Sequence, residues 1–185
     1  MLREQIKNYT PYNQQELQDQ RVMLEIMDSC SDYLLRTNET AHFTASAWVV
    51  NHDRSRLLLI CHNIYDTWTW AGGHADGEAN LLETALREVR EETGLENIRP
   101  VREDIFSLEI IPVNGHIKHG RYVSSHLHLN VTYLIEADEQ EQLHIKQDEN
   151  SGVGWFEAGE LDTLSNEKWI KETVYAKLQH KLKGE

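Results

Sequence analysis

Three glutamates lie close together near the middle of this 185-residue chain. Glu88, Glu91 and Glu92 are spaced by three and four residues across the group, so a helix over about residues 81–93 would place them on neighbouring turns of one face. Carboxylates crowded in this way repel one another unless a cation lies between them. Hard divalent ions with oxygen ligands, above all Mg²⁺, suit the arrangement, and an ion bound there could hold the phosphate oxygens of a substrate.

Local signals predict where this helix begins and ends. Asn80 is a favourable N-cap, and Glu83, three residues later, would complete a capping box. Gly94 occupies the position where a helix commonly ends in a left-handed residue. Arg87 is one helical turn from both Glu83 and Glu91, so its guanidinium is expected to bridge two carboxylates and fix their rotamers. The inward stripe is expected to be Leu82, Ala85, Leu86, Val89 and Thr93.

A Glu/Arg-rich surface helix that binds no ion is the alternative interpretation of these residues. The surroundings favour the metal site, because the segment resembles the signature of the Nudix hydrolase family. That signature runs glycine, five free positions, glutamate, seven free positions, then Arg-Glu-aliphatic-any-Glu-Glu-any-Gly-aliphatic. Residues 87–95 match the second half completely, and Gly73 falls on the first glycine. Ala79 stands where the signature has its isolated glutamate, with Glu78 one position early, so metal occupancy is expected to be altered and the chemistry retained.

The resemblance implies a cofactor and a set of catalytic residues. It implies Mg²⁺, with Mn²⁺ as a possible substitute, bound by Glu88, Glu91 and Glu92 and by the backbone carbonyl of Gly72. It also implies a general base, which in the family is either a glutamate of the signature or one from a later loop. Glu88 and Glu149 are therefore the two candidates, and Arg87 is expected to support the catalytic carboxylates.

Glu149 belongs to the polar loop Asp148-Glu149-Asn150, a few residues before a short apolar segment. Nudix proteins often place an acidic residue facing the metal ions in such a loop. A solvated loop charge is an equally weighted interpretation, and Asp148 is the fallback for the same role.

Three histidines are candidate substrate-binding residues. His126 and His128 alternate at the start of a predicted strand, so both side chains point to one face. Such a pair could ligate a metal ion. A place at the mouth of a substrate pocket is favoured, because the sequence puts no third Cys or His ligand nearby. His74 directly follows Gly73, and a pocket role there is weighted equally with simple filling of the turn.

The charge balance limits the partners of this protein. The chain has 18 Lys and Arg against 31 Asp and Glu, a formal net charge of -13, which argues against binding a nucleic acid polymer or an anionic membrane. A small phosphorylated ligand is compatible if a metal ion supplies positive charge. Cys30 and Cys61 are too few for a disulfide framework or a zinc-finger spacing, and no run approaches the roughly 20 apolar residues of a membrane span. We therefore expect a cytoplasmic protein.

Hydrophobic periodicity divides the chain into two parts. Residues 1–40 read as a helical extension with Leu17, Leu24, Met27 and Leu34 on its apolar side, which is expected to pack against the main domain; a dimerising role, and hence a homodimer, is the alternative. Residues 41–185 form the main domain. Its predicted elements are strands at 43–50, 56–60, 105–113, 127–136 and 155–156, with Trp68 and Trp70 alternating before Gly72, and a C-terminal helix at 166–182 with Trp169, Ile170, Val174 and Leu178 on one stripe. This order predicts an α/β fold with a mixed sheet between helices, and the resemblance implies the same Nudix-like α/β/α sandwich.

The leading functional hypothesis is a Mg²⁺-dependent hydrolase that cleaves a pyrophosphate bond in a nucleoside diphosphate linked to another group, such as a nucleotide sugar or a nucleoside triphosphate. A ligand-binding or sensor protein that has lost turnover is the alternative, with Ala79 as its first sign and the intact glutamate cluster against it. A prenyl diphosphate isomerase is disfavoured, because that chemistry needs a protonating cysteine and Cys61 lies in an apolar strand. The sequence leaves the substrate and its leaving group open.

Overall fold

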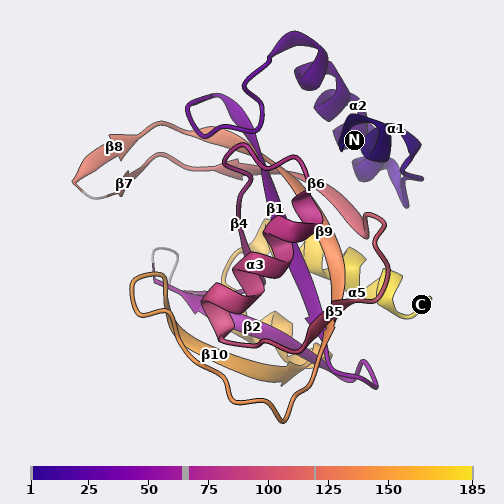
Figure 1. Ribbon diagram of the computed structural model, residues 1–185, viewed down its shortest axis with the longest axis vertical. Coiled ribbons are helices and arrows are strands. Elements are labelled where there is room, and N and C mark those ends of the chain that lie inside the picture. Colours follow the sequence, from indigo (N-terminus) through magenta and orange to yellow (C-terminus); the bar gives the residue numbers. More distant parts are fainter. Residues whose placement is uncertain (1, 64–66, 119, 185) are drawn as a thin grey trace.

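The computed structural model describes residues 2–63, 67–118 and 120–184, and its centre is a mixed β-sheet (Figure 1). The strands are β1 (Ala41–Val50), β2 (Arg56–His62), β3 (Thr67–Thr69), β4 (Ala71–His74), β5 (Ile98–Pro100), β6 (Ser107–Val113), β7 (His116–Lys118), β8 (Arg121–Val123), β9 (His126–Ala137) and β10 (Asn150–Glu157). Within the described ranges, the main sheet has the order β10-β2-β1-β9-β5, with β3 on β2, β4 on β1 and β6 on β9. The central pair β1 and β9 is parallel, the neighbouring pairs are antiparallel, and β7 and β8 form a separate hairpin.

Helices cover both faces of the sheet, which confirms the predicted α/β class (Figure 1). The helices are α1 (Leu2–Asn8), α2 (Gln14–Ser29), α3 (Leu81–Thr93), the short η1 (Ala158–Glu160) and α4 (Leu161–Leu164), and a C-terminal helix made of the π-helical η2 (Ile170–Tyr175) and α5 (Ala176–Leu182). The apolar side chains of α1, α2 and α3 belong to one core cluster, and those of η2 and α5 belong to a second. Among the described residues, no helix has both the length and the apolar character that crossing a bilayer requires.

Alternation along β1 explains the two cores. Phe43, Ala45 and Val49 belong to the cluster beneath α3, whereas Trp48 and Val50 belong to the cluster beneath the C-terminal helix. The remaining even-numbered residues of the strand are polar, namely His42, Thr44 and Ser46. The parallel neighbour β9 repeats this pattern with His128, Asn130 and Thr132, which are the register partners of those three residues. One face of the sheet is therefore polar over half its length, although these strands are buried.

The helix α3 has its predicted extent, but its first turn differs from the prediction. Gly94 ends the helix at φ 76°, in the left-handed region, as expected. Asn80 is the N-cap residue as predicted, but its side chain makes no capping hydrogen bond, and its backbone, at ψ 86°, lies outside the extended geometry typical of N-caps. The carboxylate of Glu78 instead accepts the N–H of Asn80 at 2.7 Å. Arg87 contacts Glu88 and Glu91, not Glu83, so only one of its two predicted partners is correct.

The N-terminal helices pack against the domain, as expected. Leu2, Ile6, Met23 and Met27 are buried in the cluster beneath α3. Leu17, expected on the apolar side of the extension, is 43% exposed, because Glu16 occupies the buried side of the first turns of α2.

The C-terminal helix buries Ile170, Val174 and Leu178 as predicted, while Trp169 is 43% exposed and lies off the stripe. The last strand of the main sheet is longer than the predicted two residues. The strand β5 and the hairpin β7–β8 were not predicted, because their three-residue strands are too short to show a period.

Candidate active site

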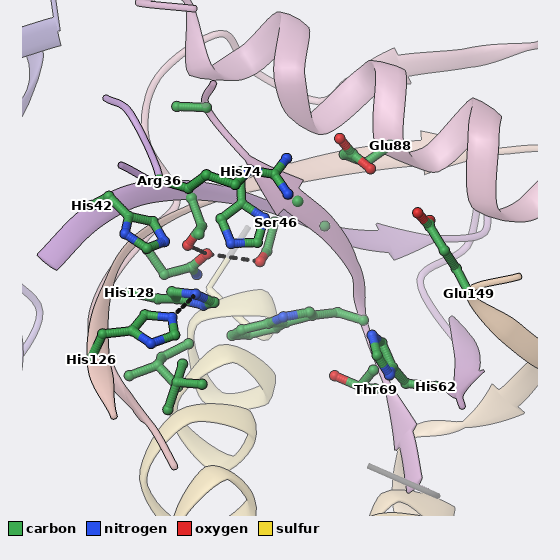
Figure 2. Close-up of a pocket in the computed structure, with 18 of the residues that line it drawn as sticks. Arg36, His42, Ser46, His62, Thr69, His74, Glu88, His126, His128 and Glu149 are labelled. Carbon is green, nitrogen blue, oxygen red and sulfur yellow. Dashed lines mark hydrogen bonds between the residues drawn. The ribbon is translucent and has the colours of Figure 1, made fainter. Parts of the chain in front are cut away.

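A cavity of about 1220 Å³ lies over the polar half of the sheet. Its walls come from β1, β4 and β9, from α3, from the loop before β10 and from the end of the N-terminal extension. Figure 2 shows two ends with different chemistry, one with carboxylates from α3 and the loop, the other with several imidazoles.

The acidic end joins two distant parts of the sequence. Glu88 and Glu92 come from α3, and Glu149 comes from the loop before β10. One carboxylate oxygen of each of the three residues lies within 4.8 Å of the others. In Figure 2, Glu88 and Glu149 approach the same space from two sides. The arrangement is a set of hard oxygen ligands of the kind that Mg²⁺ and Mn²⁺ prefer.

The glycine pair lies within the strand β4, paired with β1, and not in a turn as expected; it makes room for these carboxylates. A Cβ atom on Gly73 would overlap the carboxylate of Glu88, so a side chain at this position would displace that group. The N–H of Gly72 donates to Oε2 of Glu92 at 3.0 Å. The backbone of β4 is thus packed directly against both glutamates of α3. The predicted role of the Gly72 carbonyl as a metal ligand stays a prediction.

Burial raises the pKa of the two α3 glutamates. Glu92 is 3% exposed, and burial raises its pKa to about 8 although the Gly72 N–H stabilises the charged form. Burial also raises the pKa of Glu88, against the opposing effect of Arg87, whose Nη2 lies 2.9 Å from Oε1 of Glu88. A buried carboxyl with a pKa near 8 holds a proton at neutral pH unless a cation takes the proton's place. The residues present therefore fit a divalent metal ion.

Glu91, the remaining predicted metal ligand, has a different environment. Its side chain is 45% exposed, and its oxygens lie 3.1 Å from Nζ of Lys146 and 3.7 Å from Nε of Arg87. Lys146 also lies 3.0 Å from Glu149, so it links the loop to the helix. The structure does not bring Glu91 into the group formed by Glu88, Glu92 and Glu149, and a role for it in metal binding stays a prediction.

Hydrogen bonds between the loop and α3 position Glu149. The buried side chain of Asn150 donates to the carbonyl oxygen of Glu92 at 2.8 Å. The N–H of Asn63 donates to the carbonyl oxygen of Glu149 at 3.0 Å. These contacts fix the backbone on both sides of the glutamate. The fallback Asp148 also lines the cavity.

Four histidines gather at the other end of the cavity. His74, His126 and His128 line it, and they are joined by His42 of β1, which the sequence analysis did not identify. The ring centroids of His42, His74 and His128 are 5.0 to 5.2 Å apart. Burial lowers the pKa of His128 to about 2 and also lowers the pKa of His42, so both rings are uncharged at neutral pH. The predicted roles of these histidines in substrate binding stay predictions.

Two charged residues that the sequence did not predict, Arg36 and Lys146, also line the cavity. Arg36, at the end of the N-terminal extension, forms a two-point ion pair with Asp76, and one of its contacts is 2.7 Å. Lys146 was missed because it carries no motif. A signal for His42 was present, since His42, Thr44 and Ser46 alternate with apolar residues in a strand that is otherwise apolar.

Ala79, at the position of the isolated glutamate in the Nudix signature, is exposed, and the neighbouring Glu78 lines the cavity.

The sequence of this chain is similar to one protein family and to known relatives in that family. The NUDIX domain family model matches residues 40–178. The chain is 29% identical over 119 residues to the bis(5'-nucleosyl)-tetraphosphatase [asymmetrical] of Mus musculus. The aligned region covers 64% of this chain and 74% of that protein. It is 32% identical over 121 residues to a probable DHNTP pyrophosphohydrolase of Lactococcus lactis subsp. cremoris (strain MG1363). This second alignment covers 64% of this chain and 69% of that protein.

Solved structures show the same fold. A C. elegans Ap4A hydrolase in a binary complex matches with a TM-score of 0.56 and 17% identity, over 77% of this chain and 98% of that one. A NUDIX family hydrolase from Clostridium perfringens matches with a TM-score of 0.52 and 20% identity, over 75% of this chain and 96% of that one. The predicted Nudix-like architecture is confirmed. Because the family model spans most of the main domain and relatives with hydrolase names align with the same region, this chain belongs to the NUDIX family of hydrolases.

Proposed function

We propose that this protein hydrolyses a pyrophosphate bond in a small nucleotide-derived substrate and that it depends on Mg²⁺, with Mn²⁺ as a substitute. The observation that carries the proposal is the convergence of Glu88, Glu92 and Glu149 against the glycine pair of β4 in a large cavity. Glu92 is buried, Glu88 is largely buried, and both lie beside that glycine pair, so we assign them to metal binding together with the Gly72 carbonyl. When bound, the ion neutralises phosphate charge and acidifies a water molecule.

Glu149 is assigned as the general base. Its side chain is 42% exposed, it lies on a loop facing Glu88 and Glu92, and an exposed carboxylate in that place can accept a proton from a water molecule. Lys146 and Arg87 hold the surrounding carboxylates in place through the ion pairs described above. Glu88 is the alternative base.

The size of the cavity supports a substrate larger than a mononucleotide. Its volume of about 1220 Å³ exceeds the range of roughly 300–1,000 Å³ typical of small-ligand sites. Tyr122 of β8 lines the cavity and is 69% exposed, so its ring offers a stacking surface for a base. A nucleoside diphosphate joined to a second group fits these features, and the mouse relative is named for a dinucleoside tetraphosphate.

A binding protein without turnover is the second candidate. Two observations favour it: Ala79 replaces the isolated glutamate of the signature, and Glu78 is engaged by the backbone N–H of Asn80. The intact pair Glu88 and Glu92 favours the hydrolase.

A substrate panel distinguishes the two. Purified protein is incubated with nucleoside triphosphates, nucleotide sugars and dinucleoside polyphosphates, in Mg²⁺, in Mn²⁺ and in excess EDTA, and released phosphate and nucleotides are measured. The hydrolase proposal expects turnover of at least one compound with a metal ion and none with EDTA. Tight binding without turnover supports the sensor, and an equal rate in EDTA refutes the metal dependence.

The assignment of the base has its own test. Glu149→Gln is expected to lower kcat while Mg²⁺ affinity stays close to that of the wild type, whereas Glu88→Gln is expected to weaken Mg²⁺ binding. A Glu149→Gln protein with the wild-type rate and Mg²⁺ affinity would exclude the loop carboxylate and leave Glu88 as the base.

A further inference from the structure

The imidazole end of the cavity contains a second group of residues with metal-ligand geometry. Each of His42, His74 and His128 offers a ring nitrogen, and the three nitrogens lie within 4.8 Å of one another. Figure 2 shows these rings facing one another, away from the carboxylates of Glu88 and Glu149. The group is nitrogen-only, so it differs in chemistry from the acidic end.

The register of the sheet fixes this group. His42 of β1 and His128 of β9 are Cα partners in the parallel central pair. His74 is at the end of β4, on the other side of β1, where it is the partner of Thr44. Three adjacent strands therefore supply one imidazole each. Ligands held by adjacent strands lose little freedom when they bind an ion, because the backbone already places them.

The hydrogen bonding of His42 points to a ligand. Its Nδ1 lies 2.8 Å from the carbonyl oxygen of Asn38, so the Nδ1–H donates and the lone pair is on Nε2. His42 is 3% exposed, and its buried Nε2 has no hydrogen-bond partner within the described part of the chain. A buried acceptor without a partner is costly. A histidine whose other nitrogen donates to a backbone carbonyl is the arrangement that metal-bound histidines commonly show.

His126 positions the neighbouring ring. Its Nδ1 lies 2.8 Å from the carbonyl oxygen of Ser124, and its Nε2 lies 3.1 Å from Nε2 of His128. The ring of His128 is thus oriented by a hydrogen bond to His126, and the ring of His126 is oriented by a hydrogen bond to the backbone.

We propose that His42, His74 and His128 bind a transition-metal ion of the Zn²⁺ class, at a site separate from the carboxylates. Imidazole nitrogen favours Zn²⁺ and similar ions, whereas carboxylate oxygen favours Mg²⁺ and Mn²⁺, so the two ends of the cavity select different ions. Three protein ligands leave a fourth position for water or a phosphate oxygen of a ligand in the cavity. The site stands independently of the hydrolase proposal, because it shares no ligand with it.

Direct metal binding tests this proposal. Untagged full-length protein is stripped with EDTA, saturated with Mg²⁺ so that the carboxylates are occupied, and titrated with Zn²⁺ in a calorimeter. We expect one Zn²⁺ per chain that excess Mg²⁺ does not displace. His42→Gln and His74→Gln are each expected to weaken Zn²⁺ binding at least about tenfold. His52→Gln, whose side chain is 88% exposed, and Glu92→Gln are expected to retain Zn²⁺ binding.

Three results of the Zn²⁺ titration would contradict the proposed site. Absence of Zn²⁺ binding to the wild type, or equal binding by folded His42→Gln and His74→Gln proteins, overturns the proposal. Loss of binding in Glu92→Gln also overturns it, because the ion would then be held by the carboxylates. Because His42 is buried and its variant can fail to fold, X-ray absorption of the Zn²⁺-loaded wild type provides a second measurement. Imidazole scattering supports the site, and an oxygen-only shell refutes it.

Discussion

Two groups of buried glutamates in this protein have opposite electrostatics. In the active site, burial raises the pKa of Glu92 to about 8. Glu16 lies outside the active site, on α2, and is fully buried as well. Burial alone would raise its pKa, but Lys177, Tyr9 and Lys181 outweigh that effect and lower the pKa to about 2. The same residue type, equally buried, is thus protonated in one place and charged in the other. The difference lies in whether the protein supplies its own cation.

The second group is a lysine–glutamate cluster, formed by Glu16, Glu109, Lys177 and Lys181. Nζ of Lys177 lies 3.2 Å from Glu16 and 2.9 Å from Glu109, and Nζ of Lys181 lies 2.9 Å from Glu16. The cluster joins α2, β6 and α5, so it attaches the N-terminal extension to the C-terminal helix. Its carboxylates are satisfied internally. The active-site carboxylates are instead arranged for a cation from outside the chain.

The lysine–glutamate cluster also reaches the floor of the cavity. Asn130 donates to Glu109 at 3.0 Å, and its Oδ1 accepts hydrogen bonds from Thr44 at 3.0 Å and Ser46 at 2.8 Å. Both hydroxyl residues line the cavity. A continuous polar network therefore supports the site from below.

The largest expected effect is on the lysine–glutamate cluster. Glu16→Gln leaves Lys177 and Lys181 with less negative charge in a buried environment, so the free energy of unfolding is expected to fall by about 3–5 kcal/mol. Urea denaturation at neutral pH measures the change. Glu25→Gln is the matched control on the same helix, because its side chain is 60% exposed, and it is expected to change stability by less than about 1 kcal/mol. If both variants behave alike, the contrast between the two regions fails.

Glu92→Gln, unlike Glu16→Gln, is expected to lower activity and to leave the stability of the protein unharmed. It removes a metal ligand, so hydrolysis is expected to fall at least about 100-fold, equivalent to roughly 3 kcal/mol in the activation barrier. In metal-free protein at pH 8 the stability is expected to stay the same or to rise, because the amide keeps an acceptor for the Gly72 N–H and removes a buried charge. Steady-state kinetics and urea denaturation in EDTA test the two parts. A large loss of stability without metal would contradict the assignment.

The pH dependence of stability sharpens the comparison. The native pKa of Glu16, about 2, lies below the ordinary value of 4.5, so its contribution is present above pH 4.5 and is lost as the pH falls toward 2. The native pKa of Glu92 in metal-free protein, about 8, lies above 4.5, so its contribution is present below pH 4.5 and is lost as the pH rises through 8.

One pKa unit corresponds to about 1.4 kcal/mol, so each of these changes is expected to be on the order of 3 kcal/mol or more. Urea denaturation in EDTA across this pH range measures both. The Glu16→Gln protein is expected to lose the acid-side change only, and Glu92→Gln the alkaline-side change only. Unaltered profiles in both variants would show that other groups dominate.

Gly73→Ala is expected to have the smallest effect. The added Cβ overlaps the carboxylate of Glu88, which is the end of a flexible side chain and moves in preference to the backbone. Hydrolysis is expected to fall about tenfold, or roughly 1.4 kcal/mol, with little change in melting temperature. Gly159→Ala is the matched control, since its added Cβ meets no atom within 4 Å. Equal rates in the two variants would show that the position of Glu88 against β4 is not required for activity.

Local patterns in the sequence were sufficient for much of the fold. The extent of α3 and its end at Gly94 follow from i, i+3 and i+4 spacing and from the left-handed conformation that glycine tolerates. Alternation places His126 and His128 on one face. The expected capping box at Asn80 is absent because the neighbouring Glu78 accepts the N–H that Glu83 was expected to accept. Leu17 is exposed because Glu16, which pairs with Lys177 and Lys181, takes the buried side.

By itself, the sequence determined the α3 glutamates, the end of α3 at Gly94 and the alternation of the strands, because each depends on residues a few positions apart. Only the tertiary structure decided that Glu149 faces Glu88 and Glu92, that Lys177 and Lys181 neutralise Glu16, and that His42 and His74 join His128. These contacts depend on the parallel register of β1 with β9 and on the docking of distant helices. Register and docking are chosen by the packing of the whole domain, which no short segment specifies.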